Sequence, residues 1–399
     1  MSAFQAAAQA PVSLRTRLAV APDSADVAYY GKRNFGQAAL TVVGLNLSVW
    51  AFDRYVQNAD FAHISLDSFK ENLSHGLIWD NDLLSTNMFL HPYHGNLYFN
   101  SARSNGCNYW QSGLFAFAGS AMWEFLMEQE YPSTNDLIAT PIGGMALGEI
   151  AFRASDLMLD DRTRGWSRFG HEAAVFVISP MREITRIING DAWRYRPTTG
   201  RLFGNPNISG DVSVGARWLR RQNKRSDNNF GFTTELNLEY GNRYELRSSS
   251  PYDYFKLHVN LAIQRSQPVI SQINATGRLV SREIIDTENN DASIGLYQHY
   301  DFYDSDTISF HKGAKTPYRL AVPACAGAGL LYKGTDFGGW SVDAFSHVNA
   351  VLLGGILTDH YNVNDRNYNL ASGFSVKTGT TFLYKNDLLS ISAGYDYYR

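Results

Sequence analysis

The second half of the chain repeats one pattern, in which apolar and polar residues alternate along runs of about a dozen residues. In one such run, the apolar residues Phe230, Phe232 and Leu236 alternate with Thr233 and Glu235. A period of two residues is typical of a β-strand with one apolar face and one polar face. Long strands of this kind, repeated many times, predict an outer-membrane β-barrel whose apolar face contacts lipid.

Nine runs of this type follow one another from about residue 210, separated by polar, turn-rich segments. They cover residues 211–221, 229–240, 253–265, 270–285, 291–303, 316–333, 338–352, 368–384 and 387–398. Closed bacterial barrels have an even number of strands, so further strands are expected. The candidates are residues 170–179, the stretch near Leu202, or a strand beyond Arg399. We therefore predict an antiparallel transmembrane barrel of about ten to twelve strands.

The composition of the chain argues against two classes of protein, helical membrane proteins and nucleic-acid-binding proteins. The chain has a net charge of −3, an aromatic fraction of 14% and a mean hydropathy of −0.27. A helical membrane protein would be far more apolar, and a nucleic-acid-binding protein would need a basic surface. Tyr and Trp are the residues of the aromatic girdles of membrane barrels. We expect an outer-membrane location, with outer-membrane lipid or lipopolysaccharide and other envelope proteins as candidate partners, no nucleic acid and no cofactor.

The first 195 residues do not alternate and instead contain apolar blocks of helical length. The blocks at residues 36–55 and 113–127 are at or below the roughly 20 residues of a membrane-spanning helix, and the second contains Glu124. Gly144 and Gly148 form a GxxxG stripe that lets another backbone approach closely. We therefore predict a helical region that plugs or underlies the barrel lumen. The expected parts are an N-terminal extension (1–34), a helical plug or periplasmic region (35–195) and the barrel (196–399).

Local signals mark where these helices begin and end. Ser133 and Asp136 have the spacing of a capping box. Thr140–Pro141 has the order of an N-cap followed by proline at the first helical position, which predicts another helix start. A short helix is expected between Ser179–Pro180 and Gly190.

The two cysteines, Cys107 and Cys325, lie far apart in the sequence. They could form one disulfide in an oxidising compartment, although sequence alone does not pair them. The alternative, two small buried apolar side chains, is the preferred interpretation.

Several short motifs lie within residues 79–153. They are Trp79-Asp80-x-Asp82, Thr86-Asn87-x-Phe89-x-His91-Pro92-Tyr93-His94-Gly95, Ala102-Arg103-Ser104-Asn105-Gly106, Ser120-Ala121-Met122-Trp123-Glu124, Pro132-Ser133-x-Asn135-Asp136 and Gly143-Gly144-x-x-x-Gly148-Glu149. In these motifs the chain resembles an uncharacterised family of predicted outer-membrane barrels from Gram-negative bacteria, known only as a domain of unknown function. The resemblance covers the first half closely and the strands only in general pattern. It implies the location and the architecture, and it brings no catalytic assignment.

His91 and His94 are candidate metal ligands together with Asp80 and Asp82, since His and carboxylate side chains are typical ligands. Their spacing is loose, and Pro92 separates the two imidazoles. The preferred alternative is a structured turn in which both histidines bond to the backbone.

Glu124 is the best single candidate for a general acid or base, because burial in an apolar helix raises the pKa of a carboxyl group. Ser120 precedes it by one turn on the same helix face. The alternative is a structural hydrogen bond to Arg103, Asn105 or another helix.

Two further carboxylates have simpler interpretations. Glu149 is followed four residues later by Arg153, the spacing of a helical ion pair. Asp136 is interpreted first as a capping residue. No nucleophile elbow, catalytic triad order or phosphate loop is present in the sequence.

Two functional hypotheses follow. The leading one is a non-catalytic structural, binding or transport component of the envelope, with a lumen closed by helices. The alternative is a membrane-embedded hydrolase that modifies lipid or lipopolysaccharide. In it, Glu124 acts as acid or base, His91 and His94 assist or bind a metal, and Asp136 and Glu149 lie behind them. The alternative requires Glu124, His91 and His94 to converge within hydrogen-bond reach in one cavity.

Overall fold

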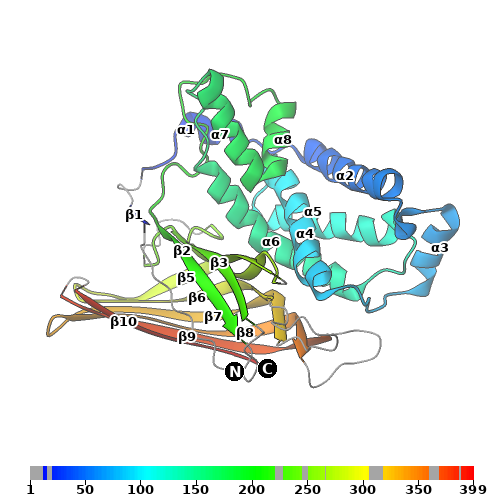
Figure 1. The fold of residues 1–399 in the computed structure, drawn as a ribbon. Helices are drawn as coiled ribbons and strands as arrows, with labels where there is room; N and C mark the ends of the chain where they lie inside the picture. The colour runs from blue at the N-terminus through cyan, green and yellow to red at the C-terminus, as the bar shows by residue number, and fades with distance from the viewer. Residues whose placement is uncertain are drawn as a thin grey trace. The chain divides into compact units, whose positions relative to one another are not determined.

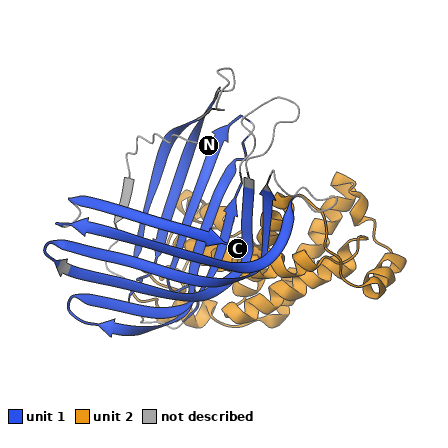
Figure 2. Ribbon diagram, turned by 90° about the horizontal axis from the view of Figure 1, so that it is seen from below, with its two compact units in different colours: residues 1–17, 207–399 blue, residues 18–206 orange. Residues whose placement is uncertain are grey.

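The chain folds into two compact units (Figure 2), one helical and one built from a β-sheet. The computed structural model describes residues 12–15, 20–220, 228–244, 250–265, 267–304, 318–358, 368–385 and 388–399. Residues 18–206 make up the helical unit, and residues 1–17 with 207–399 make up the sheet unit. The expected N-terminal extension is divided between them, since residues 12–15 form a strand and residues 24–30 form a helix.

The helical unit contains eight α-helices within its described residues (Figure 1). They are α1 (Ser24–Tyr30), α2 (Phe35–Phe52), α3 (Leu66–His75), α4 (His91–Arg103), α5 (Tyr109–Met122), α6 (Thr134–Asp156), α7 (Gly165–Ile178) and α8 (Pro180–Ile188). The shorter segments are the π-helices η1 (Asp53–Gln57), η3 (Thr86–Leu90) and η4 (Trp123–Met127) and the 3-10 helix η2 (Asp60–Ala62). The helices expected at residues 36–55, at residues 113–127 and after Ser179–Pro180 are confirmed. Among the described helices, residues 35–57 alone are long and apolar enough to cross a membrane.

Helices α4 and α6 pack at backbone contact through glycine. A methyl group on Gly95 would lie 1.7 Å from the carbonyl oxygen of Thr140, and one on Gly144 would lie 2.3 Å from the carbonyl carbon of Gly95. One turn later, a methyl group on Gly148 would lie 2.6 Å from the ring of Phe99. The GxxxG stripe therefore serves close packing inside the helical unit.

The helix start predicted at Thr140–Pro141 was wrong, because α6 already begins at Thr134 and runs through Pro141. The Ser133 hydroxyl accepts from the backbone N–H of Asp136 at 3.2 Å, which gives half of the predicted capping box. The backbone N–H of Ser133 donates to the carboxylate of Glu124 at 2.7 Å, in place of Asp136. Pro141 removes one helical hydrogen bond, a cost of about 3 kcal/mol that the extensive burial of α6 offsets.

The sheet unit is a single antiparallel sheet of ten strands, each paired with its neighbours in sequence. The strands are β1 (Val12–Arg15), β2 (Ile208–Arg220), β3 (Asn228–Tyr240), β4 (Phe255–Gln264), β5 (Ile270–Asp286), β6 (Asn290–Tyr303), β7 (Tyr318–Phe337), β8 (Trp340–Thr358), β9 (Asn369–Tyr384) and β10 (Leu389–Tyr398). The nine predicted strands are all confirmed, as β2 to β10. The sheet curls into a half-barrel, and in the described residues β1 and β10 are its two edges (Figure 2).

In the described residues the tenth strand is β1, and neither of the two expected segments within the chain supplies it. The strand predicted at residues 170–179 was wrong, because these residues belong to α7 and buried Arg168, Glu172 and Val175 recur at helical spacing. No strand forms at Leu202, whose backbone N–H donates to the carboxylate of Asp156.

The two faces of the sheet have the reverse of the polarity found in a water-soluble protein. On β3, Phe230 has 61% of its surface exposed, whereas Thr233 has 8%. On β9, Phe374 is exposed, whereas Ser375 and Lys377 are buried. On β3 and β9, these apolar side chains therefore point outward and these polar side chains point inward.

The inward polar side chains bond to one another across the sheet. Lys377 on β9 donates to both carboxylate oxygens of Asp301 on β6, at 2.5 Å each. His347 on β8 lies 3.0 Å from His299 on β6, measured between ring nitrogens. Strands β6 and β9 would lie about 14 Å apart in a flat sheet, so the polar face is the concave one. The concave side is therefore occupied by side chains of the sheet itself.

Candidate functional site

The motifs of the first half meet at the N-terminus of α6. Asn135, in its first turn, accepts from the backbone N–H of Asp80 at 3.1 Å. Its side-chain amide donates to the carboxylates of Asp80 and Asp136 at 3.2 and 3.1 Å. Asn87 donates to the second oxygen of Asp80 at 2.9 Å. Free backbone N–H groups and the helix dipole favour negative charge at a helix N-terminus, which explains why carboxylates gather there.

The carboxyl groups of Asp136 and Asp80 form a hydrogen bond with each other. Burial, followed by the hydrogen bond and the charge of Asp80, raises the pKa of Asp136 well above its usual range. Burial also acts to raise the pKa of Asp80, but hydrogen bonds from Asp136 and Asn87 outweigh it and lower that pKa to about 2. The opposite shifts make Asp136 the member of the pair that retains its proton to higher pH, and Asp80 the carboxylate that accepts the hydrogen bond.

His91 lies beside this pair, with its Nε2 atom 3.8 Å from Oδ1 of Asp136. Burial lowers the pKa of His91 to about 4, so the imidazole is neutral at pH 7. The contact with Asp136 is then neither an ion pair nor a hydrogen bond, because 3.8 Å exceeds hydrogen-bond distance. An acid, a carboxylate and a neutral imidazole are nevertheless adjacent here.

His94 makes a different set of contacts. Its ring stacks on Tyr98 with centroids 4.5 Å apart and meets the edge of Trp123 at 5.3 Å. Its Nε2 atom is buried and has no hydrogen-bond partner among the described residues, and burial lowers its pKa to about 3. The structured-turn interpretation was wrong, because residues 91–95 are the first turn of α4 with Pro92 at its start. The chain is already helical before Pro92, since η3 ends at Leu90 and the backbone N–H of His91 donates to the carbonyl oxygen of Thr86.

Glu124 lies in η4, where a π-helical turn follows α5. Its carboxylate accepts the backbone N–H of Ser133 and forms a hydrogen bond with Glu128. Burial raises the pKa of Glu124 to about 7, partly offset by the bond from Ser133, and raises the pKa of Glu128 further. Of the structural partners predicted for Glu124, another helix supplies the contact through Ser133 at the start of α6, whereas Arg103 and Asn105 bond elsewhere.

Glu149 is fully buried between two arginines. The predicted pair with Arg153 is present at 2.8 Å, and Arg103 from α4 adds a second contact at 2.7 Å. Burial acts to raise the pKa of Glu149, but the charges of Arg103 and Arg153 outweigh it and lower that pKa. Arg103, Glu149 and Arg153 therefore connect α4 to α6, and we call this group the Glu149 brace.

The structure thus brings Asp80, Asp136 and His91 together and places the other candidates in separate contacts. Among the described residues, no hydrogen bond joins Glu124 to His91 or His94. The convergence that the hydrolase hypothesis requires is therefore not seen in these contacts.

The metal candidates are also not gathered into one ligand set. Asp82 contributes its backbone N–H to Asp80 at 2.7 Å, and burial raises the pKa of its own carboxyl group. In the described ranges, three or more His, Cys, Asp or Glu ligand atoms lie within 4.8 Å of one another only in the sheet unit, at Glu283, Asp286 and Asp291.

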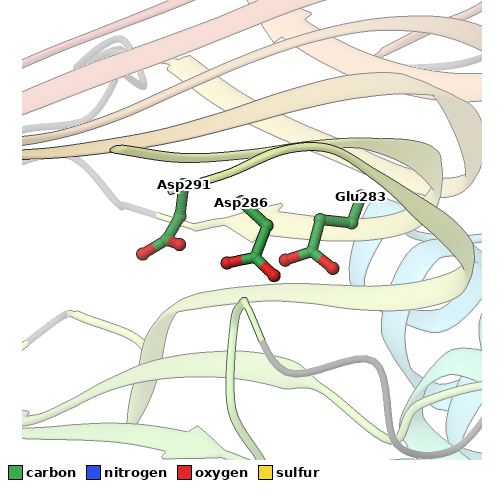
Figure 3. Close-up of side chains that lie close together, drawn as sticks. All are labelled: Glu283, Asp286 and Asp291. Carbon is green, nitrogen blue, oxygen red and sulfur yellow. The ribbon is translucent and has the colours of Figure 1, made fainter. Parts of the chain in front are cut away.

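These three acidic residues lie at the β5–β6 hairpin (Figure 3). Their carboxylate oxygens are the ligands that Ca²⁺ or Mg²⁺ prefers. The sequence gives no clear signal for this cluster, because Asp286 and Asp291 stand at the two ends of one of the polar segments that separate the predicted strands. Glu283 and Asp286 are exposed, so water can satisfy these side chains as well as a cation.

A second polar cluster missed from the sequence lies between α7 and α8. Arg186 donates to Glu172 at 2.8 and 2.9 Å and to Asp161 at 2.7 Å, and Arg168 lies 2.9 Å from Asp161. A cavity of about 30 Å³, lined in part by Arg186 and Tyr30, adjoins it and is large enough for about one water molecule. The available signal was the four-residue spacing of Arg168 and Glu172.

Both cysteines are buried and free, as the preferred interpretation expected. Cys107 packs with Ala38 and Ala102 in the helical unit, and Cys325 packs with Val322 and Val351 in the sheet unit.

Residues 76–181 match a family described as "Domain of unknown function (DUF3943)". The match is consistent with the uncharacterised family expected from the motifs, and it includes the cluster at the start of α6 and the Glu149 brace. Neither a curated protein nor a solved structure matches the chain.

Proposed function

We propose that this protein is an outer-membrane β-barrel component of a bacterial envelope, with the apolar, convex face of its sheet in contact with phospholipid or lipopolysaccharide. The reversed polarity of the sheet carries the proposal. Phe230, Phe232 and Phe374 are exposed on strands whose opposite face is polar. Water-soluble monomers rarely expose large contiguous apolar areas, whereas membrane barrels do so along every strand.

The concave face supports the same proposal. The ion pair between Lys377 and Asp301 is buried inside the curved sheet, while Phe374 points outward from the same strand. A protein in water would gain free energy from the opposite arrangement, because exposed apolar surface and buried charge are both unfavourable there. In lipid the apolar face is solvated by hydrocarbon, and polar side chains belong inside.

The role that these contacts support is structural or binding. The concave side is crossed by side chains such as Lys377 and His347, which does not favour an open pore. The carboxylates of Asp80, Asp136 and Glu124 hold the first turn of α6 in place. A helical unit that plugs or underlies the lumen stays a prediction.

A charge on the convex face tests the membrane location. Phe232→Arg or Phe374→Arg should cost about 2–4 kcal/mol near the bilayer midplane and reduce the folded protein in the outer-membrane fraction. Asn289→Arg, at an exposed position of the β5–β6 hairpin turn, is the matched control and should leave that amount unchanged. The measurement is urea titration of the protein folded into vesicles, together with fractionation of the envelope. Wild-type protein that stays in solution without detergent would refute the proposal, as would an unaffected Phe232→Arg variant.

A further inference from the structure

Helix α7 in the helical unit exposes its apolar face and buries its charged face. Trp166 has 87% of its surface exposed and Val177 has 79%, and Phe169 between them is also exposed. Arg168 and Glu172 point the other way and are buried. A surface helix of a water-soluble protein normally has the reverse arrangement.

Helix α8 shows the same inversion. Arg186 is buried, whereas Ile188 has 62% of its surface exposed. Ion pairs fix the rotation of both helices, because Arg186 on α8 binds Glu172 on α7 and also Asp161. The charged faces must therefore stay inward, and the apolar faces must point outward.

The segment after α8 extends the exposed apolar surface. Arg168 holds this segment against α7 by donating to the carbonyl oxygen of Ala192 at 2.8 Å. The guanidinium of Arg164 lies 4.3 Å from the centroid of the Tyr195 ring, and Trp193 beside it is exposed. We call the whole surface the apolar patch; it consists of Trp166, Phe169, Val177, Ile188, Trp193 and Tyr195.

The charges around the apolar patch are predominantly positive. Residues 160–197, all of which the structure describes, contain seven arginines and five acidic residues. Arg162, Arg164 and Arg194 are exposed, and each acidic residue of this segment is buried or half-buried. Arg162 pairs with Asp160 at 2.7 Å and Arg194 with Asp191 at 3.3 Å, whereas Arg164 lies over the ring of Tyr195. The surface that a partner meets therefore carries exposed guanidinium groups and Trp side chains, with an excess of two positive charges over residues 160–197.

We propose that the apolar patch binds the surface of a membrane that contains anionic phospholipid, with α7 and α8 lying in the plane of the interface. Exposed Trp and apolar residues fit the boundary between headgroups and acyl chains, and the arginines fit lipid phosphate. The inference rests on the proposed function, which brings the chain to an envelope membrane. A protein partner would not require a cationic rim around the apolar residues.

Spin labels on the full chain test this inference. Phe169→Cys places a nitroxide on the apolar patch, Phe232→Cys places one on the sheet, and Lys70→Cys places one on an exposed polar site in α3. The two native cysteines are replaced by alanine. In vesicles of phosphatidylethanolamine and phosphatidylglycerol, the label at position 169 should collide with oxygen more than with a water-soluble nickel chelate. The label at position 70 should show the opposite preference.

Position 169 decides the inference and position 232 decides the proposed function. A label at 169 that collides mainly with the nickel chelate overturns the inference, even if the label at 232 lies in lipid. A label at 169 shielded from both reagents also overturns it, because protein then covers the patch. If the label at 232 lies in water, the proposed function fails, and a lipid-exposed label at 169 would still support surface binding.

The cationic rim has its own test. Replacing Arg162, Arg164 and Arg194 by Gln should lower the lipid-exposed fraction of the 169 label several-fold in anionic vesicles and leave it unchanged in phosphatidylcholine vesicles. An equal fraction before and after replacement in anionic vesicles would overturn the assignment to anionic lipid. Lys70→Gln, which removes a positive charge far from this segment in sequence, is the control.

Discussion

Burial of the Glu124 carboxyl group makes the free energy of unfolding depend on pH. Its pKa is about 7 in the folded protein against an ordinary value of 4.5, because the group is buried. The folded state therefore binds more protons than the unfolded state between these values, so the free energy of unfolding falls as pH rises from about 4.5 to 7. The loss is roughly 3 kcal/mol as an upper bound, since Glu128 shares the proton.

Glu124→Gln should remove this loss, because an amide can accept the bond from Ser133 without carrying charge. Urea unfolding at pH 5 and pH 8 measures the free energy of unfolding of both proteins. At pH 8 the Glu124→Gln variant should be more stable than the wild type. The exposed residue Glu71 on α3 gives the control, as Glu71→Gln should keep the wild-type pH dependence. A Glu124→Gln variant that loses stability at both pH values would contradict this account and assign Glu124 another role.

At the scale of elements, the contact between α4 and α6 depends on the absence of a side chain. Gly95→Ala places a methyl group 1.7 Å from the backbone oxygen of Thr140, so the helices must separate. We expect a loss of about 1–3 kcal/mol in the free energy of unfolding. Gly170→Ala on α7 meets no atom within 4 Å and should gain up to about 1 kcal/mol from helix propensity. Thermal unfolding followed by circular dichroism compares the stabilities of the two variants. An equal change in stability for Gly95→Ala and Gly170→Ala would argue against the close contact of α4 and α6.

The elements also show which features the sequence could predict. The strands β2 to β10 were predictable because one face of each is apolar and the other polar, so that the period of two is visible in the sequence. The strand β1 was not, because four residues cannot display a period. α7 was mistaken for a strand because its ion pairs with α8 replace the apolar buried face that normally marks a helix.

For the candidate residues too, contacts within one helix were predictable and contacts between distant segments were not. The pairing of Glu149 with Arg153 was predictable because both lie on one helix at four-residue spacing. The hydrogen bond between Asp80 and Asp136 was not predictable, because it depends on tertiary packing that brings residues 80 and 136 together. The bond from Ser133 to Glu124 likewise joins two helical segments whose approach no local pattern encodes.

At the scale of the whole molecule, each unit contains buried ion pairs that join elements whose apolar side chains are in part exposed. In the sheet, Lys377 and Asp301 join β9 to β6 across the concave face. In the helical unit, Arg186 and Glu172 join α8 to α7 in the same way. The proposed membrane location would explain both arrangements, because a protein surrounded by lipid keeps its ion pairs inside.

The curvature of the sheet gives the last prediction. Lys377→Met leaves Asp301 buried without its cation, which should cost about 3–5 kcal/mol and loosen the contact between β6 and β9. Lys256→Met is the matched control: Lys256 on β4 pairs with Glu239 at 3.4 Å, and its side chain is 43% exposed. The free energy of unfolding lost in Lys256→Met should stay below about 1 kcal/mol. Urea titration of each variant folded in detergent micelles measures both values. Equal losses would show that the curvature does not depend on the buried pair, and that backbone pairing alone holds the sheet in its curled form.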